Sequence, residues 1–515
     1  MNLDTSLAQL ETAQLVRRID DAESAYQFKH ALTQDSAYES LLKSDRKHLH
    51  RLVAETTERV YSDQLDEFAG VLAHHYAEAG DDAKTLEYAT RAGNAAAQRF
   101  ANAEARLYYS KALDALARLP DDAAHRRARV DAIIRYVSVA LRYEGPHRSL
   151  ARLLEAEKLA LELYGATPAT RNDRLHLARL RYWIAQAYLH GNQPREAIQY
   201  LQEVLSVAQA EGDDELRAIP ESMLGRALAI QGKFADAEPH LRTATRMLDS
   251  NATNHEAVLA RGMLGWVLAA RGNYAAGIAE GERARTVAVQ AGSLTGTALS
   301  GMALCLIALT GGDTARLMEM SQETLRVAEK AGDQLLIYIG YGYQAWAESR
   351  LGDPVAASAS MAKSKQIAQQ SGGRLTSADA FAVASAEIAL NAGRSTEALA
   401  LVEQTVKSAQ SIGDNYAQGL AHRVWGEALA RLDPPQYDQA QTHFADSLHL
   451  FEEGDARLEA ARTRVAWGSM LRDRGDEDAA RTQFERAAAQ FEASQLFAEA
   501  HRTRGWLESA PPHAS

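Results

Sequence analysis

The stretch Gly265-Trp-Val-Leu-Ala-Ala-Arg-Gly272-Asn273-Tyr274-Ala-Ala-Gly277 decides the fold class. An apolar segment with helical spacing ends at Gly272-Asn273, and a second segment of the same kind begins directly after it. Glycine readily adopts the left-handed conformation that ends a helix, and the Asn or Asp that follows can cap the next helix. The stretch therefore predicts two antiparallel helices joined by a short turn.

The same turn returns along the chain every 40 or 41 residues, and a second series of turns lies halfway between. Asn251 fills one gap, and Asp433-Pro434-Pro435 replaces one glycine turn. A fixed period of this length indicates stacked structural repeats, here pairs of helices of about 17 residues. The first series is Gly191-Asn192, Gly232-Lys233, Gly272-Asn273, Gly312-Asp313, Gly352-Asp353, Gly393-Arg394 and Gly475-Asp476; the second is Gly212-Asp213, Gly292-Ser293, Gly332-Asp333, Gly372-Gly373, Gly413-Asp414 and Gly454-Asp455.

Small residues recur at one position in each first helix and at one position in each second helix. Two helices approach closely only where the side chains at their crossing are small, so these positions predict the crossing of each pair. The first helices carry Ala185, Gly225, Gly265, Cys305, Ala345, Ala386, Gly426 and Gly468, and the second helices carry Ala197, Ala237, Gly277, Ala357, Ala398, Ala440 and Ala480, with Leu317 as the exception.

This pattern resembles the tetratricopeptide repeat, whose motif combines a small residue in the first helix, a Gly-Asp or Gly-Asn turn and a small residue in the second helix. The resemblance covers about residues 66–509, with longer units than the family's usual ones. It implies an all-α, right-handed superhelical solenoid of antiparallel helix pairs. We expect a partial winged-helix-like module at 1–60, divergent helical repeats at 61–170, regular repeats at 171–510 and a tail at 511–515.

The first sixty residues break the period. A short strand near Tyr26 and a following helix that runs through to Val60 are expected, with Leu7 to Ile19 as the preceding helix. The segment resembles the end of the winged-helix module that links the nucleotide-binding domain to the repeats in bacterial STAND-type ATPases, some of which carry a cyclase domain. The matching residues are Tyr26, Phe28, His30, Ala31, Tyr38, Leu41, Leu42, Arg46 and His50.

Composition narrows the class of protein. Apolar residues make up 46% of the chain and only 11 residues are proline, which favours a helical protein with a core. The formal net charge of -12 argues against nucleic-acid binding. The basic run from Lys43 to Arg51 is interrupted by acidic residues and is expected to be a solvated helix face.

The single cysteine, Cys305, lies in an apolar run and is expected in the core. No secretory signal or membrane span is evident in the sequence, so we expect a cytoplasmic protein.

Motifs for catalysis and for metal binding are incomplete. No Gly-x4-Gly-Lys-Ser/Thr phosphate loop occurs, so ATP hydrolysis by this chain is not expected. His255-Glu256 lacks the second histidine of a zinc helix, and His74-His75 are adjacent, so their side chains leave the helix about 100° apart. Gly340-x-Gly342 falls in a repeat helix rather than after a strand. We therefore expect no enzyme activity, cofactor or metal.

The remaining candidates lie on the inner surface of the superhelix, which the first helices line. Trp and Arg are the side chains that most often anchor protein interfaces, although the two tryptophans are also expected to pack between repeats. The candidate partner-binding residues are Ser222, Arg226, Trp266, Trp346, Glu387, Arg423 and Glu427.

The sequence thus predicts a non-catalytic protein-protein interaction scaffold or regulatory sensor that binds a protein or peptide along a concave face. The resemblance implies a nucleotide-binding ATPase or a cyclase as the partner. The alternatives are a sensor that holds a small-molecule inducer in the superhelix lumen and a remnant of a cyclase or ATPase that retains no separate role. The sequence leaves the oligomeric state open.

Overall fold

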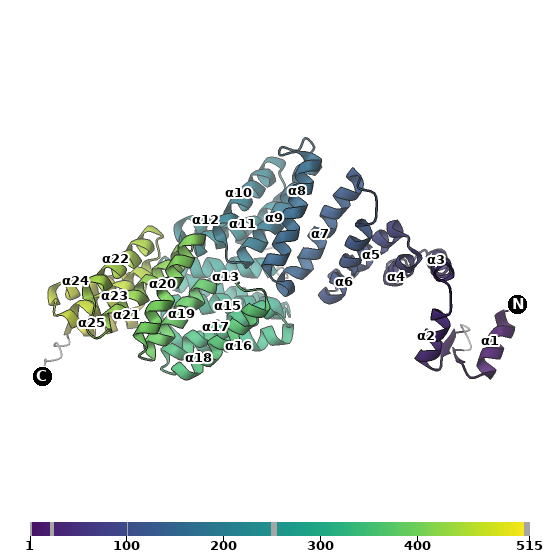
Figure 1. The fold of residues 1–515 in the computed structure, drawn as a ribbon. Coiled ribbons are helices and arrows are strands. Elements are labelled where there is room, and N and C mark those ends of the chain that lie inside the picture. Colours follow the sequence, from purple (N-terminus) through teal and green to yellow (C-terminus); the bar gives the residue numbers. More distant parts are fainter. Residues whose placement is uncertain (1–2, 21–24, 100, 249–254, 509–515) are drawn as a thin grey trace. The chain divides into compact units, whose positions relative to one another are not determined.

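The computed structural model describes residues 3–20, 25–99, 101–248 and 255–508, which fall into two compact units, 1–139 and 140–515. Asn251 and the tail 511–515 lie outside the described residues. Within the described residues the chain forms 25 helices and one two-stranded hairpin (Figure 1). The prediction of an all-α helical-repeat solenoid is confirmed.

Unit 1 begins with the elements that break the repeat period. Its elements are α1 (Leu3–Thr12), β1 (Val16–Asp20), β2 (Ala25–Phe28), α2 (Ala31–Glu39), α3 (Lys43–Val60), α4 (Ala69–Ala79), α5 (Asp82–Gln98), α6 (Asn102–Leu116) and the start of α7 (Ala123–Glu144). The expected strand near Tyr26 is present as β2, which pairs antiparallel with β1. The expected helix from Leu7 to Ile19 is wrong beyond Thr12, because Val16 to Asp20 alternate as a strand and pair with β2.

The helix predicted to follow the strand is divided into α2 and α3. Ser40 ends α2, and Leu42 has extended backbone angles at the start of α3, so the chain changes direction between them. The helix α3 ends at Val60, within unit 1.

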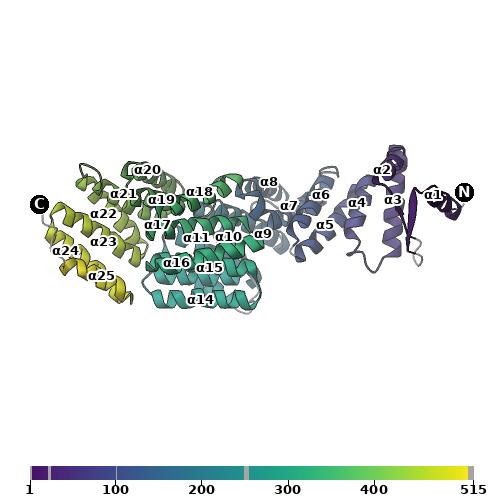
Figure 2. The ribbon, with the colours of Figure 1, turned by 90° about the horizontal axis from the view of Figure 1, so that it is seen from below.

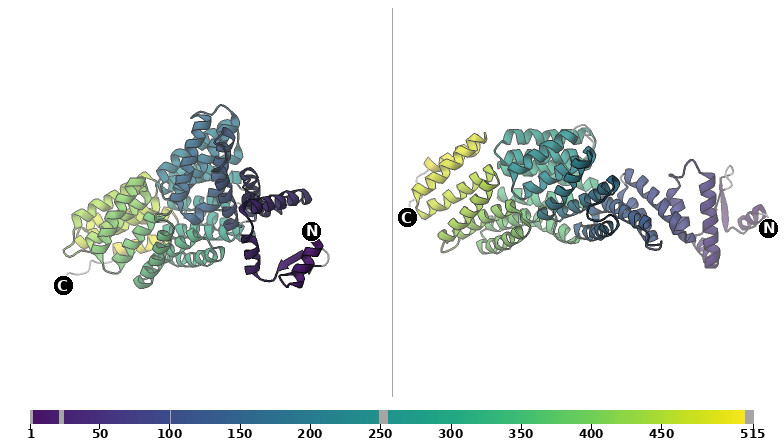
Figure 3. Two further views of the ribbon diagram at one scale, coloured as in Figure 1. Left: turned by 45° about the vertical axis from the view of Figure 1, so that its right-hand side comes forward. Right: turned by 90° about the horizontal axis from the view of Figure 1, so that it is seen from above.

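Unit 2 continues as antiparallel helix pairs, seen from other sides in Figure 2 and Figure 3. Figure 2 shows α14, α15 and α16 side by side. The helices are α8 (Pro146–Tyr164), α9 (Arg171–His190), α10 (Pro194–Glu211), α11 (Asp214–Ile230), α12 (Phe234–Leu248), α13 (His255–Ala270), α14 (Tyr274–Gln290), α15 (Leu294–Gly311), α16 (Thr314–Ala331), α17 (Gln334–Arg350), α18 (Pro354–Gln370), α19 (Ala378–Asn391), α20 (Ser395–Ile412), α21 (Asn415–Ala430), α22 (Tyr437–Glu453), α23 (Arg457–Arg474), α24 (Glu477–Ala493) and α25 (Phe497–Glu508).

The turn chemistry and the helix crossings follow the sequence pattern. Gly312 has φ +76° and ends α15, and the Asp313 carboxylate accepts a hydrogen bond from the backbone N–H of Arg316 at 3.0 Å to cap α16. At the crossing of α13 and α14, a Cβ on Gly265 would lie 2.6 Å from the carbonyl oxygen of Gly277. Any larger residue at position 265 would therefore push the two helices apart, so the predicted role of the small residues is confirmed here.

The superhelix of unit 2 closes on itself, so that turns far apart in sequence meet. The backbone N–H of Thr376 donates to the carbonyl of His190 at 2.8 Å, and that of Phe234 donates to the carbonyl of Gly454 at 3.0 Å. The Arg271 guanidinium lies 2.7 Å from a carboxylate oxygen of Asp455, 184 residues further on. These contacts turn the inner surface of unit 2 into the wall of a lumen.

The first helix α13 is consequently buried nearly all round. In α13 every residue from Val258 to Ala270 is buried, whereas the second helix α12 buries one stripe that includes Phe234 and Leu241. One helix of the described residues, Leu294–Gly311, is long and apolar enough to cross a membrane, but 72% of it is buried among its neighbours. Its composition is that of a core helix of the array.

Candidate functional site

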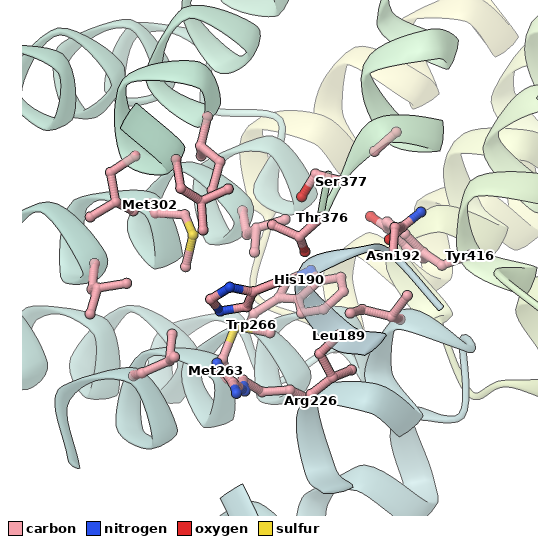
Figure 4. Close-up of a pocket in the computed structure, with 18 of the residues that line it drawn as sticks. Leu189, His190, Asn192, Arg226, Met263, Trp266, Met302, Thr376, Ser377 and Tyr416 are labelled. Carbon is pink, nitrogen blue, oxygen red and sulfur yellow. The ribbon is translucent and has the colours of Figure 1, made fainter. Parts of the chain in front are cut away.

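The lumen of unit 2 contains a cavity of about 120 Å³, here called the first cavity. Figure 4 shows Met263 and Trp266 reaching it from α13, Met302 from α15, and Thr376 and Ser377 from the segment before α19. Its wall is mostly apolar. The apolar members are Leu189, Ile230, Leu259, Met263, Trp266, Leu299, Met302, Leu306, Leu335, Leu336, Ile339, Ala380 and Ala417.

Several buried polar atoms on this wall have no hydrogen-bond partner among the described residues. They include Oε1 of Gln186, Oδ1 of Asn192, the Tyr416 hydroxyl, and Nε and Nη2 of Arg226. Gln186 is only 6% exposed. A buried polar atom left without a partner costs about 1–3 kcal/mol, so native proteins rarely keep several together without a reason. The arrangement therefore provides two acceptors and a cationic donor to an occupant of the cavity.

The local fold explains why these side chains are held there. Asn192 adopts a left-handed conformation (φ +55°) in the turn after α9. Its side-chain N–H group donates to Asp379 at 3.3 Å, which fixes the amide and leaves its carbonyl oxygen unpaired. Asp379 also accepts a hydrogen bond from Ser408 at 2.9 Å and pairs with Arg374. Contacts between turns therefore hold the polar end of the cavity in place.

Asp414 supplies a titratable group to the same wall. Burial, reinforced by the nearby charge of Asp379, raises the pKa of Asp414 to about 7. Burial also raises the pKa of Asp379, although Arg374 opposes this effect. The carboxylate of Asp414 caps α21 by accepting a hydrogen bond from the N–H of Ala417 at 2.9 Å.

A second cavity of about 500 Å³ lies further along unit 2, and nine of its 21 lining residues are charged. Arg423 donates to Glu459 at 2.6 Å. Arg350 donates to Glu387 at 2.8 Å. Burial alone would raise the pKa of Glu387, but the Arg350 guanidinium outweighs it and holds that pKa below its usual value. These charged side chains of the second cavity thus form ion pairs within the protein.

The seven predicted partner-binding residues divide between these places. Arg226 and Trp266 line the first cavity, and Glu387, Arg423 and Glu427 line the second. Ser222 and Trp346 are buried and line neither.

Both tryptophans pack between repeats, as the alternative interpretation expects. Trp266 donates to Thr310 at 3.2 Å and meets the rings of Phe234 and Tyr416 edge to face. Trp346 is buried and donates to Glu387 at 2.8 Å.

Sequence reasoning missed several residues of the first cavity. Gln186, His190 and Asn192 come from the end of α9 and its turn, while Thr376, Ser377 and Asp414 come from turns about 190 to 220 residues later. Asn192 and Asp414 stand out in the sequence only as turn and capping residues. No local signal places them on one wall, because the closure of the superhelix brings them together.

The dismissed motifs have clear structural explanations. Gly340 and Gly342 lie within α17, where an added Cβ would meet Leu325 and Phe381 respectively. Cys305 is buried, as expected, and burial raises the pKa of its thiol far above the usual value.

The histidines behave differently from the sequence expectation. One ring nitrogen each of His50, His74 and His75 lies within 4.8 Å of the other two, so the angle of about 100° between adjacent side chains does not keep His74 and His75 from facing one point. The Nδ1 atoms of His50 and His75 are 2.8 Å apart, and the Tyr38 hydroxyl lies 3.0 Å from Nε2 of His50. The side chains of His74 and His75 on α4 both reach His50 on α3. The angular spacing of residues around a helix does not predict this, because it does not specify the side-chain conformation.

Comparisons with known proteins found one family model and several solved structures that match the chain. Residues 176–250 match the family model described as tetratricopeptide repeat. Solved structures that match the chain include one described as the apo form of RapI (14% identity, 54% of this chain and 99% of that chain, TM-score 0.37). Another is described as a Rap protein complexed with competence and sporulation factor (10% identity, 81% and 99%, TM-score 0.41). No curated protein sequence matches the chain. The chain is accordingly an all-α helical-repeat protein in which residues 176–250 match the tetratricopeptide repeat.

Proposed function

We propose that this chain is a non-catalytic, cytoplasmic interaction protein whose repeats bind a peptide segment of a protein partner in the lumen of unit 2. The observation that carries the proposal is the first cavity, an apolar pocket with unpartnered buried polar atoms on its wall. An apolar cavity of roughly 150 Å³ can hold a molecule the size of benzene. The volume of about 120 Å³ therefore suits one apolar side chain of a peptide.

The polar atoms fit a peptide backbone better than a purely apolar ligand. Every peptide unit offers one N–H donor and one carbonyl acceptor. Gln186 Oε1 and Asn192 Oδ1 would accept from backbone N–H groups, while the Arg226 guanidinium would donate to a carbonyl or to a terminal carboxylate. An anchor side chain in the cavity and a backbone held beside it would give both affinity and orientation.

For residues 1–60 we propose a nucleotide-binding ATPase or a cyclase module as the partner, as the resemblance of this segment implies. The exposed apolar side chains of α3 support a contact with another protein. Monomeric proteins seldom leave such groups uncovered together. The exposed apolar side chains of α3 are Leu49, Leu52, Val53 and Val60.

The second candidate function is a sensor for a small-molecule inducer in the same cavity. It is favoured by the small volume of the cavity and by the turn-to-turn contacts that close the lumen around it. Both candidate functions place the ligand in the first cavity, so identifying what binds there distinguishes the peptide-binding function from the sensor.

A photo-crosslinking amino acid at Met302, on the wall of the first cavity, tests the proposal in lysate of the native host. We expect a protein or peptide product that is absent when the crosslinker replaces Val355, an exposed residue of α18. The cavity-filling change Ala380→Phe should abolish the product, whereas Ala359→Phe on the exposed face of α18 should not.

Native mass spectrometry of the same proteins completes the test. A small molecule retained by the unmodified chain and released by Ala380→Phe, without any protein product, would establish the sensor. If the experiments yield no crosslinked product and no retained molecule, both candidate functions are contradicted.

A further inference from the structure

The helix pair α21 and α22 brings two imidazoles and a carboxylate to one point outside the first cavity. Nδ1 of His422 lies 2.9 Å from Nδ1 of His443 and 3.8 Å from a carboxylate oxygen of Asp446. All three ligand atoms lie within 4.8 Å of one another. His443 and Asp446 are three residues apart on α22 and therefore share one face of that helix, opposite His422 on α21.

From this geometry we infer that His422, His443 and Asp446 form a binding site for a divalent transition-metal ion of the zinc class. Zinc binds histidine nitrogen at about 2.0–2.1 Å and carboxylate oxygen at similar distances. Two nitrogens 2.9 Å apart would then subtend about 90° at the ion, and a small opening of the pair would reach tetrahedral geometry. Three protein ligands leave a fourth position for water.

The surroundings fix the rings in a binding orientation. The Trp425 indole stacks on the His443 ring, with ring centres 4.1 Å apart and planes 15° from parallel. His422 is buried and its ring lies 5.2 Å from that of His443. The rigid placement of two imidazoles reduces the conformational entropy lost when an ion binds.

The charges also suit a cation. Asp446 places a negative charge beside the two imidazoles, and a neutral imidazole binds a metal through its free ring nitrogen. The Asp446 side chain is 51% exposed, so solvent and ions can reach the site. The mixed nitrogen and oxygen ligands disfavour Ca²⁺ and Mg²⁺, which take oxygen ligands.

Without an ion, the two Nδ1 atoms must share one proton in a hydrogen bond. This metal-free pairing is the competing explanation, and it requires no role for Asp446. The metal site, by contrast, requires all three side chains. Removing the carboxylate therefore separates the two explanations without disturbing the buried rings.

The test is a titration of the full chain with Zn²⁺ by calorimetry and with Co²⁺ by visible absorption. Asp446→Asn changes an exposed side chain, and His443→Ala removes a second ligand. His449→Ala is the matched control, because His449 lies on the same helix and is 77% exposed. We expect at least about tenfold weaker Zn²⁺ binding in both ligand variants, judged from the loss that even supporting residues cause, and wild-type binding in the control.

Zinc binding by the histidine group of unit 1 does not affect the comparison between variants. Any ion held by His50, His74 and His75 contributes equally to all variants and cancels in the comparison with His449→Ala. Far-ultraviolet circular dichroism without metal verifies that the variants are folded. If Asp446→Asn and His443→Ala bind Zn²⁺ as His449→Ala does, or if the wild-type chain binds none, the proposal is overturned.

Discussion

The first and second cavities of unit 2 both contain arginine side chains from first helices, but the two arginines differ in what surrounds them. Arg226 lines the first cavity, and two of its nitrogens have no partner among the described residues. Arg423 in the second cavity donates to Glu459, whose carboxylate also accepts from Arg462 at 3.1 Å. This difference indicates that Arg226 is available to a ligand, whereas Arg423 stabilises the helical array.

Loss of the paired arginine should have the largest effect on stability. In Arg423→Ala the Glu459 carboxylate stays buried at 2% exposure with one of its guanidinium partners removed. Breaking a buried ion pair typically costs about 3–5 kcal/mol, and the remaining Arg462 contact places the expected loss at the lower end. Chemical unfolding measures this loss.

Arg431→Ala is the control for that loss. Arg431 is 53% exposed and lies 4.0 Å from Glu427, so its removal should cost less than about 1 kcal/mol. Equal losses in the two variants would break the distinction between paired and exposed arginines.

A middle-sized effect is expected from the titration of Asp414 beside the first cavity. Its folded pKa of about 7 lies above the unfolded value of 3.8, so between these pH values the folded chain binds more protons than the unfolded chain. Stability should therefore be greatest at low pH within this window and fall as the pH rises towards 7. The slope is at most about 1.4 kcal/mol per pH unit.

Asp414→Asn should flatten this slope, because asparagine keeps the helix cap but does not titrate. Thermal melting of wild type and variant from pH 4 to 7.5 provides the measurement. Asp353→Asn, an exposed cap of α18, is the matched control and should leave the slope unchanged. A slope that persists in Asp414→Asn would mean that other carboxyl groups, such as Asp379, cause it.

The repeat architecture could be predicted because its signals are local. A glycine turn such as Gly312-Asp313 and a small crossing residue such as Gly265 act on their immediate neighbours, and both behave in the structure as the sequence indicates. The hairpin strand Val16–Asp20 was missed because a five-residue alternation is too short to compete with a helical interpretation.

The candidate site was only partly predictable. Arg226 and Trp266 could be assigned to the inner surface from their place in the repeat. Asn192 and Asp414 could not, since their role depends on the closure of the superhelix over more than 180 residues. Curvature accumulates from small rotations between repeats, and no single position in the sequence specifies it.

Replacement of Arg226 should cause the smallest loss of stability and the clearest loss of binding. Arg226→Met keeps an apolar stem on the wall but removes the unpaired guanidinium, so the free energy of unfolding should stay the same or rise. Binding of the peptide or molecule captured at Met302 should fall at least tenfold, because a charge-assisted hydrogen bond in an apolar pocket contributes about 1.5–3 kcal/mol. Melting and calorimetric binding of Arg226→Met and Arg423→Met, measured together, make the comparison sharp. If Arg226→Met destabilises the chain as much as Arg423→Met and leaves binding intact, the two arginines have the same structural role, and the first cavity loses its claim to be the binding site.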